Sequence, residues 1–162
     1  HHAVSKGMDG RIVRPFNAYG VDMLGDAYGQ VVGMFFQAVR EQEPMAVHGD
    51  GTQTRSFTHI DDIVDGFYRA GHMDVALDGS SLRGCSFNLG SSEEVSIRSL
   101  AEAVNRTVGS MAVDFVLGGG YHGDSQRRLP DTDAAERLLG WSCHISLRDG
   151  LDQVWQAFQA GP

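Results

Sequence analysis

Hydrophobic residues recur along this chain at two spacings, one typical of helices and the other of short strands. Where they recur every three or four residues they form one face of a helix. This pattern predicts helices at residues 30–42, 61–71, 97–108 and 146–160, and a shorter helix at residues 132–139. Short apolar runs next to turn residues predict strands at residues 11–17, 45–47, 85–89 and 112–117.

Polar residues and glycine mark the ends of these elements. Ser96 is placed to cap the start of a helix, and Gly140 is placed to end one. Asp61 and Asp62 stand where a helix N-terminus favours carboxylates. The run Ile12–Val13 is interpreted as a buried strand that ends in an Asn-Ala-Tyr-Gly turn. Site residues often lie at such strand ends.

Length and charge restrict the classes of protein to consider. With 162 residues and 41% hydrophobic content, the chain can bury one sizeable core, so we expect a single domain at 1–162. A net charge of −8 argues against non-specific nucleic-acid binding, which depends on clustered Lys and Arg. No apolar run is long enough to cross a membrane, and the first ten residues lack the apolar core of a signal peptide. A cytoplasmic protein is the expectation.

Three common kinds of site find no support in the residue spacing. Cys85 and Cys143 lack CxxC spacing, which favours two reduced, part-buried thiols over a disulfide or zinc site. The seven histidines include no helical i, i+4 pair with a plausible third ligand, so we expect no metal. No Gly-x-Ser-x-Gly motif is present to support a hydrolytic triad.

One glycine-rich motif imitates a dinucleotide fingerprint. Residues 118–123 satisfy G-x-G-x-x-G directly after a predicted strand. A true fingerprint opens a helix whose N-terminal amides meet the pyrophosphate, and an acidic residue follows the next strand. Here the glycines lead into the polar, proline-containing sequence DSQRRLP. We therefore interpret residues 118–130 as a loop.

The arginines are more informative than the glycines. Arg55 follows a Gly/Thr/Gln loop, and Arg127 and Arg128 lie in a segment too polar to be core. A planar guanidinium matches phosphate oxygens in bidentate fashion, and two arginines from distant loops can hold a pyrophosphate between them. Composition alone favours solvated surface arginines. Residue types therefore leave both interpretations open.

Six short blocks, in order, resemble a known family. They are RPFNAYG (14–20), VHGDGTQTRSF (47–57), HIDD (59–62), FNLG (87–90), RLPD (128–131) and LLGW (138–141). Their order and spacing are similar to those of the NAD-dependent epimerase/dehydratase family, the extended short-chain dehydrogenase/reductases. The QTRSF and RLPD blocks bring the chain closest to UDP-glucuronate decarboxylases and similar UDP-glucose 4-epimerase-like enzymes. The resemblance covers nearly the whole chain.

This resemblance implies roles for several residues. Phe16 is expected near the nicotinamide of NAD, and Asn17 is expected to hydrogen-bond the nucleotide-sugar near its phosphates. Arg55 and Arg128 are expected to hold the two phosphates. Asp131 is expected to lie near the ribose or to orient Arg128.

The same resemblance implies which residues lie near the base of the nucleotide. Val31 and Val32, which open the first helix, are expected to pack near the base and ribose. Ala46 and His48 lie in a short strand that is expected to offer backbone groups to the edge of the base, as an edge strand can.

Part of the family pattern belongs to sequence before Arg11, where this chain has ten residues. That part holds the glycine-rich turn, the active-site Ser/Thr and the Tyr-x-x-x-Lys pair. Residues His2 to Lys6 imitate the last of these with His in place of Tyr, but Lys6 is only eight positions before Arg14, too few for the helix that carries the pair. We interpret the match as coincidence. Without the tyrosine base and its lysine no hydride cycle can run, so we assign no catalytic residue.

The expected fold is α/β: the C-terminal part of an extended short-chain dehydrogenase/reductase Rossmann fold with a small mixed α/β substrate-binding lobe. The leading hypothesis for function is the UDP-sugar-binding portion of an NAD-dependent sugar-nucleotide epimerase, dehydratase or decarboxylase, inactive alone. NAD is then the cofactor of the intact enzyme, and the partner is an N-terminal NAD-binding half or a second copy. The alternatives are a non-catalytic nucleotide-sugar-binding or partner-complementing domain, and a small enzyme that uses Lys6 or the histidines. The sequence leaves open which sugar and which of the three reactions.

Overall fold

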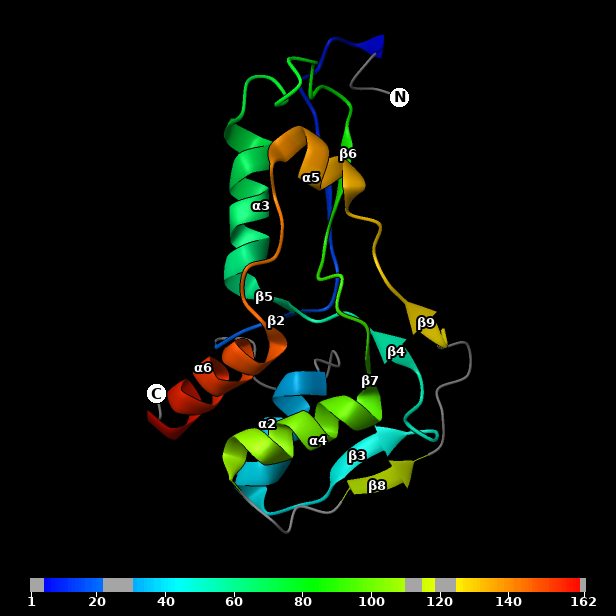
Figure 1. The fold of residues 1–162 in the computed structure, drawn as a ribbon, viewed down its shortest axis with the longest axis vertical. Coiled ribbons are helices and arrows are strands. Elements are labelled where there is room, and N and C mark those ends of the chain that lie inside the picture. The colour runs from blue at the N-terminus through cyan, green and yellow to red at the C-terminus, as the bar shows by residue number, and fades with distance from the viewer. Residues whose placement is uncertain (1–4, 22–30, 110–114, 119–124, 161–162) are drawn as a thin grey trace.

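The computed structural model describes residues 5–21, 31–109, 115–118 and 125–160, and every structural statement below concerns these residues. Figure 1 shows an elongated molecule in two parts, here called the first lobe and the second lobe. The first lobe, at the top, contains β1 (Ile12–Pro15), β6 (Ser86–Leu89), α3 (Ile60–His72) and α5 (Asp133–Leu139). The second lobe, at the bottom, contains α2 (Val31–Glu41), β3 (Met45–His48), α4 (Ile97–Val108), β8 (Phe115–Gly118) and α6 (Leu147–Ala160).

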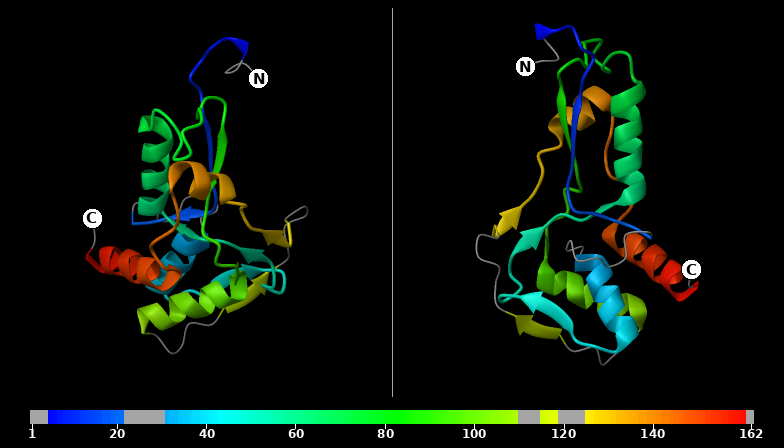
Figure 2. Two further views of the ribbon diagram at one scale, coloured as in Figure 1. Left: turned by 45° about the horizontal axis from the view of Figure 1, so that its top comes forward. Right: turned by 180° about the vertical axis from the view of Figure 1, so that it is seen from behind.

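The first lobe is built on a parallel pair of strands. β1 and β6 pair with Val13 opposite Phe87, and they run side by side in both views of Figure 2. α3 and α5 pack on this pair and bury Phe87, Leu89 and Trp141 between them. Parallel strands are stable when helices cover them, because their side chains are largely apolar.

The second lobe has its own core, formed mainly by three helices. α2, α4 and α6 meet through apolar faces, as their helical spacing predicted. The buried residues of this core include Val32, Phe35, Phe36, Leu100 and Leu151. β3 and β8 form a parallel pair beside these helices, with Val47 opposite Leu117.

Short strands lie between the lobes. β4 (Thr54–Arg55) is the central strand of a three-stranded sheet, with β7 (Val95–Ser96) antiparallel on one side and β9 (Arg127–Arg128) parallel on the other. β2 (Ala18–Tyr19) and β5 (Thr58–His59) form a further parallel pair. Figure 1 shows both groups where the two lobes meet, so segments from most of the chain converge there.

The expected helices are confirmed to within a few residues, and their caps explain why. Ser96 Oγ accepts a hydrogen bond of 3.0 Å from the backbone N–H of Ser99 at the start of α4. Gly140 ends α5 with φ of 62°, a left-handed conformation that favours glycine. α3 begins one residue earlier than expected, because His59 Nδ1 accepts from Asp61 N at 3.3 Å.

Two expectations need correction. Ile12 is 56% exposed, so β1 is not a buried strand: among the described strands it pairs with β6 alone and has an open edge. Residues 118–130 are not loop throughout, since Gly118 ends β8 and Arg127–Arg128 form β9, whereas residues 119–124 lie outside the described part. Asp62 lies in the first turn of α3, as expected, and its buried carboxylate accepts hydrogen bonds from the backbone of His144 and Ile145.

The two cysteines agree with the sequence. Cys85 and Cys143 are free and half-buried, as expected. In the described part of the chain, no helix has the length and apolar character needed to cross a membrane. The same residues include no group of three or more His, Cys, Asp or Glu side chains that could hold a metal ion.

Candidate functional site

Arg55 and Arg128 are register partners in the parallel pair of β4 and β9. Neighbouring strands lie about 4.8 Å apart, and paired residues of a parallel ladder project from the same face of the sheet. The structure therefore brings together the two arginines that the sequence singled out. Arg55 is 6% exposed and its Nη1 donates to the carbonyl of Thr54 at 2.7 Å, whereas Arg128 is exposed. One guanidinium is thus fixed in the interior and the other lies at the surface.

The opposite face of the same sheet carries a carboxylate that sequence reasoning missed. Glu94 Oε1 accepts from Thr54 Oγ1 at 2.6 Å and from Arg127 Nε at 2.8 Å, and Oε2 accepts from Arg127 Nη2 at 2.9 Å. These hydrogen bonds, first from Arg127 and then from Thr54, lower the pKa of Glu94 to about 2. Because side chains alternate along a strand, this network and the two arginines occupy different faces.

Asn17 lies beside the strand that carries Arg55. Its Nδ2 donates to the carbonyl of Ser56 at 2.7 Å, and its own carbonyl accepts from the backbone N–H of Thr58 at 3.2 Å. Its φ of 39° is in the left-handed region, which asparagine tolerates better than most residues. The carboxamide has a second N–H and an acceptor oxygen, with which a ligand can form hydrogen bonds.

Three of the sequence blocks meet at Gly90. A Cβ atom at Gly90 would stand 2.5 Å from Pro130 Cγ and 3.0 Å from Phe16 Cβ, so only glycine allows this approach. Phe16 is half-buried at the carboxyl end of β1, and its N–H donates to the carbonyl of Leu89 at 2.8 Å. The contact places Phe16 close to Pro130, two residues after Arg128.

Asp131 is held at the start of α5. Its backbone carbonyl accepts from Asn88 Nδ2 at 2.7 Å, and its Oδ1 accepts from the backbone N–H of Asp133 at 3.1 Å. The side chain is exposed on the same segment as Arg128. Its expected contact with the ribose or with Arg128 stays a prediction.

The residues expected at the base lie in the second lobe. Val32 is 3% exposed and belongs to the core, whereas Val31 is half-buried at the start of α2. Ala46 and His48 are exposed on β3, and the carbonyl of His48 accepts from Gln53 Nε2 at 2.9 Å. Within the described residues β3 pairs with β8 alone. Their contact with a base stays a prediction.

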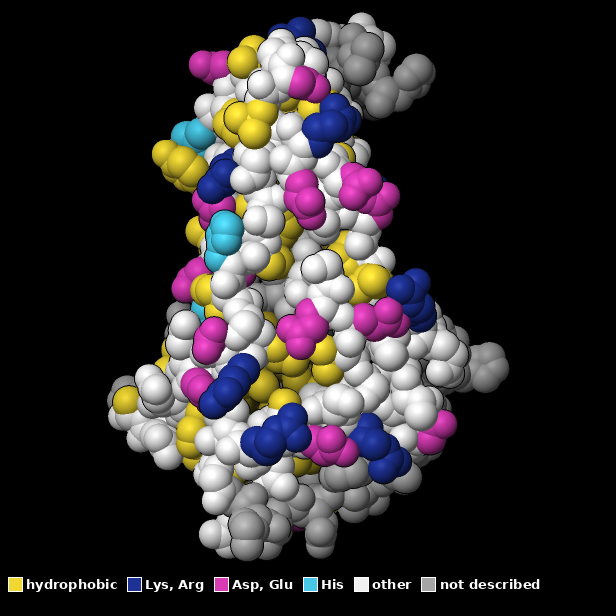
Figure 3. All heavy atoms as spheres, in the orientation of Figure 1, with side chains coloured by type: hydrophobic (Ala, Val, Ile, Leu, Met, Phe, Trp, Pro, Cys, Tyr) yellow, Lys and Arg dark blue, Asp and Glu magenta, His cyan; other side chains and the backbone are white. Residues whose placement is uncertain are grey.

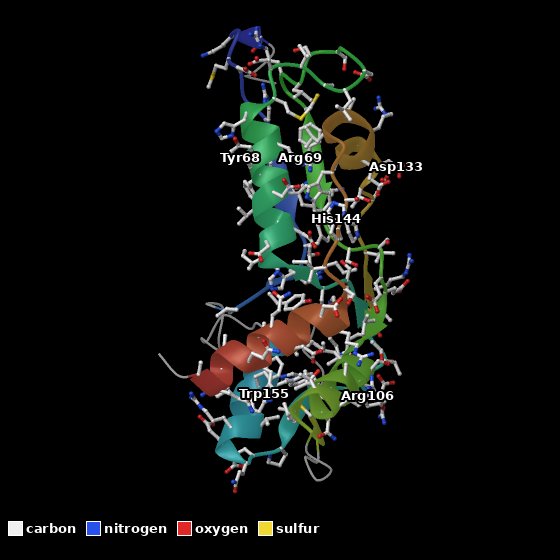
Figure 4. All side chains as sticks on the ribbon, turned by 60° about the vertical axis from the view of Figure 1, so that its left-hand side comes forward. Tyr68, Arg69, Arg106, Asp133, His144 and Trp155 are labelled. Carbon is white, nitrogen blue, oxygen red and sulfur yellow. The ribbon has the colours of Figure 1, made fainter. Side chains whose placement is uncertain are left out.

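Hydrophobic side chains are exposed in two places, where the lobes meet and on α3. On the face seen in Figure 3, hydrophobic side chains gather where the lobes meet, and charged side chains of both signs surround them. On α3, by contrast, an apolar strip is exposed at helical spacing: Val64 is 58%, Phe67 48% and Tyr68 61% exposed. Tyr68 and Arg69 leave α3 on different sides (Figure 4), and Arg69 Nη1 donates to the carbonyl of Gly140 at 2.8 Å. We call Val64, Phe67 and Tyr68 the α3 strip.

Comparison with known proteins connects this arrangement to a family. Residues 1–90 match the model described as "Epimerase: NAD dependent epimerase/dehydratase family". The chain is 36% identical over 149 residues to UDP-glucuronic acid decarboxylase 2 of Arabidopsis thaliana, an alignment that covers 92% of this chain and 31% of that protein. It is 34% identical over 155 residues to UDP-glucuronic acid decarboxylase 1 of Danio rerio, covering 94% of this chain and 34% of that protein. The chain thus spans about a third of the length of these relatives.

Solved structures show the same fold. The chain matches UDP-glucuronic acid 4-epimerase from Bacillus cereus, in complex with UDP-glucuronic acid and NAD, with a TM-score of 0.82 and 27% identity, over 95% of this chain and 46% of that one. It matches UDP-glucose 4-epimerase from Thermotoga maritima, with UDP-glucose, with a TM-score of 0.85 and 25% identity, over 98% and 48%. These matches confirm the expected α/β class, with part of a Rossmann fold and a small mixed lobe.

Proposed function

The chain belongs to the NAD dependent epimerase/dehydratase family, and we propose that it is the portion of such an enzyme that binds the UDP-sugar. In this proposal Arg55 and Arg128 hold the pyrophosphate between them, and we call this pair the clamp. The observation that carries the proposal is their register: they come from segments far apart in sequence and lie side by side on one face of the sheet.

The physical chemistry of the pair supports an anionic ligand. Two positive side chains directly opposite each other on neighbouring strands repel, and an anion bound to both reduces that repulsion. Guanidinium groups match phosphate oxygens with two parallel hydrogen bonds, and such charge-assisted bonds are about twice as strong as neutral ones. Because Arg55 is already ordered by its bond to Thr54, it loses little freedom when a phosphate binds.

Other residues complete the proposed site. Asn17, next to Ser56, bonds the nucleotide-sugar near its phosphates, and Asp131 faces the ribose or Arg128. Val31, with Ala46 and His48 from β3, lies on the base side, where Val32 can contribute only its backbone because its side chain is core.

The cofactor of the family fits the same edge of the first lobe. Phe16 is half-buried at the carboxyl end of β1, the end at which open parallel sheets bind nucleotides, and its flat apolar ring suits a nicotinamide neighbour. In the intact enzyme, NAD held beside Phe16 would supply hydride transfer to and from the sugar. The contribution of this chain is to hold and orient the sugar nucleotide. We propose no turnover by the chain alone.

Calorimetric titration of the 162-residue chain with UDP tests this function. We expect binding, and we expect Arg55→Ala and Arg128→Ala each to weaken it roughly tenfold or more, since each removes a charge-assisted pair of hydrogen bonds. Arg106→Ala removes an exposed arginine of α4 and serves as the matched control. Unchanged affinity in both clamp variants would refute the proposal.

The α3 strip favours a second candidate function, a domain that complements a partner chain. An exposed apolar surface on an otherwise folded domain commonly marks a protein contact. The partner in this proposal is an NAD-binding half or a second copy of the chain. Sedimentation at increasing concentration, with and without Phe67→Lys, tests it: a monomer at all concentrations excludes the second copy.

The proposal that this chain has no turnover alone has its own test. Turnover of UDP-glucuronic acid by the purified chain with NAD would contradict it.

A further inference from the structure

We infer that Glu94 is a positioning residue for the clamp, which holds β9 in register with β4 so that Arg128 lies opposite Arg55. The inference rests on the proposed function and goes beyond it, since it assigns a role to a residue on the other face of the sheet.

The first argument is connectivity. Glu94 immediately precedes β7, an outer strand of the three-stranded sheet. Its carboxylate bonds Thr54 of the central strand and, through both oxygens, Arg127 of the other outer strand. One side chain therefore joins all three strands of the sheet.

The second argument is register. Thr54 and Arg127 are the register pair immediately before Arg55 and Arg128. When Glu94 binds both members of the first pair, a slip of β9 by one residue breaks its bonds to Arg127. Such a slip also moves Arg128 to the opposite face, because side chains alternate along a strand. The side chain of Glu94 thus acts on the position of Arg128 without contact with a phosphate.

The third argument is that β9 is short and exposed. It is two residues long, and its two described residues are exposed. Besides the ladder with β4, the backbone bond from Thr54 N to the carbonyl of Gln126 at 2.8 Å holds its start. In such a short, exposed strand, the two bonds from Arg127 to the carboxylate of Glu94 help to fix the position of the strand.

The test compares UDP affinity and melting temperature in the full chain. We expect Glu94→Gln to weaken UDP binding roughly fivefold, the scale of an exposed ion pair, with little change in melting temperature. Arg127→Gln should give the same loss, and the double variant should lose no more, because both act through one interaction. Glu102→Gln, which changes an exposed carboxylate of α4 and gives the same net charge, is the control.

A charge swap separates positioning from general stability. Glu94→Arg combined with Arg127→Glu restores an ion pair with opposite polarity, so we expect UDP affinity to return toward that of the unaltered chain.

If Glu94→Gln binds UDP normally while the Arg55 and Arg128 variants do not, the inference is wrong and the function stands. If Glu94→Gln lowers the melting temperature and the swap restores neither property, Glu94 has only a structural role and the inference is also wrong. If the unaltered chain does not bind UDP, the proposed function fails and the inference fails with it.

Discussion

Asp62 and Ile145 join two distant segments of the chain: Oδ2 of Asp62 accepts a hydrogen bond of 3.0 Å from the backbone N–H of Ile145. Both carboxylate oxygens also accept from the backbone N–H of His144, at 3.2 Å each. Asp62 is 5% exposed and lies in the first turn of α3, whereas His144 and Ile145 lie in the segment that leads into α6. A single carboxylate therefore holds the segment that leads into α6 against the start of α3.

Removal of that carboxylate should destabilise the fold. Asp62→Ala leaves the part-buried backbone N–H groups of His144 and Ile145 without their acceptor, and we expect it to lower the free energy of unfolding by about 1–3 kcal/mol. Urea denaturation of the variant and the unaltered chain measures the difference. Asp61→Ala is the control, because that side chain is 72% exposed. Equal losses in the two variants would contradict the assignment.

Asp62 also shows where local sequence patterns stop being sufficient. The helices and their ends could be predicted, since apolar spacing and caps such as Ser96 act over a few residues. The role of Asp62 could not be predicted, because its hydrogen-bond partners are more than eighty residues away along the chain. The exposure of Ile12 was missed for a related reason: strand burial depends on what covers the sheet, and the run of apolar residues carries no such information.

The candidate site also contains residues that the sequence identifies and a residue that it does not. Arg55, Arg128 and Asn17 could be singled out because they stand in blocks that resemble the family. Glu94 gave no signal, since its partners Thr54 and Arg127 become neighbours only when β4 and β9 pair. A two-residue strand such as β9 is too short to show an alternating pattern, so the sequence alone predicted loop.

Gly90→Ala should disturb both the fold and ligand binding. The added methyl group would stand 2.5 Å from Pro130 Cγ and 3.0 Å from Phe16 Cβ, so the neighbouring backbone must move. We expect a loss of about 1–3 kcal/mol in unfolding free energy, the usual cost of overpacking, and weaker UDP binding because Pro130 follows Arg128 closely. Urea denaturation and calorimetry measure the two effects.

The control for Gly90 is another glycine-to-alanine change. Gly71 lies near the end of α3 with open space around it and an ordinary helical backbone, so Gly71→Ala should be neutral or slightly stabilising. If Gly90→Ala behaves like Gly71→Ala, the close approach of Phe16, Gly90 and Pro130 is not important for stability.

Cys143 should react slowly with alkylating reagents in the folded chain. Burial, and then the negative charge of Asp62, raises the pKa of its thiol to about 12. Only the thiolate is nucleophilic, so the rate of reaction with iodoacetamide should rise roughly tenfold for each pH unit between pH 7 and 9, without a plateau. Mass spectrometry of the peptide that contains Cys143 measures the rate, and the urea-unfolded chain provides the reference. A plateau below pH 9 would disagree with the raised pKa.

The contribution of Glu94 to stability should depend on pH in a definite direction. Its pKa is lowered from 4.5 to about 2 by the bonds from Arg127 on β9 and Thr54 on β4, and that of Arg127 is raised, so the pair stays charged at neutral pH. A group whose pKa is lower in the folded chain stabilises the fold fully above its unfolded value and loses this effect as pH falls through the folded value. We therefore expect Glu94→Gln to melt only slightly below Glu102→Gln, because the pair is exposed, and by a constant margin from pH 8 to 5. The margin should shrink as pH falls from 4.5 toward 2, because Glu94 of the Glu102→Gln variant becomes protonated there and loses the charge that Glu94→Gln lacks at every pH.

The two variants have the same net charge, so the effect of overall charge on melting cancels in the comparison. A margin between their melting temperatures that grows in acid would show that Glu94 is not ionised in this network.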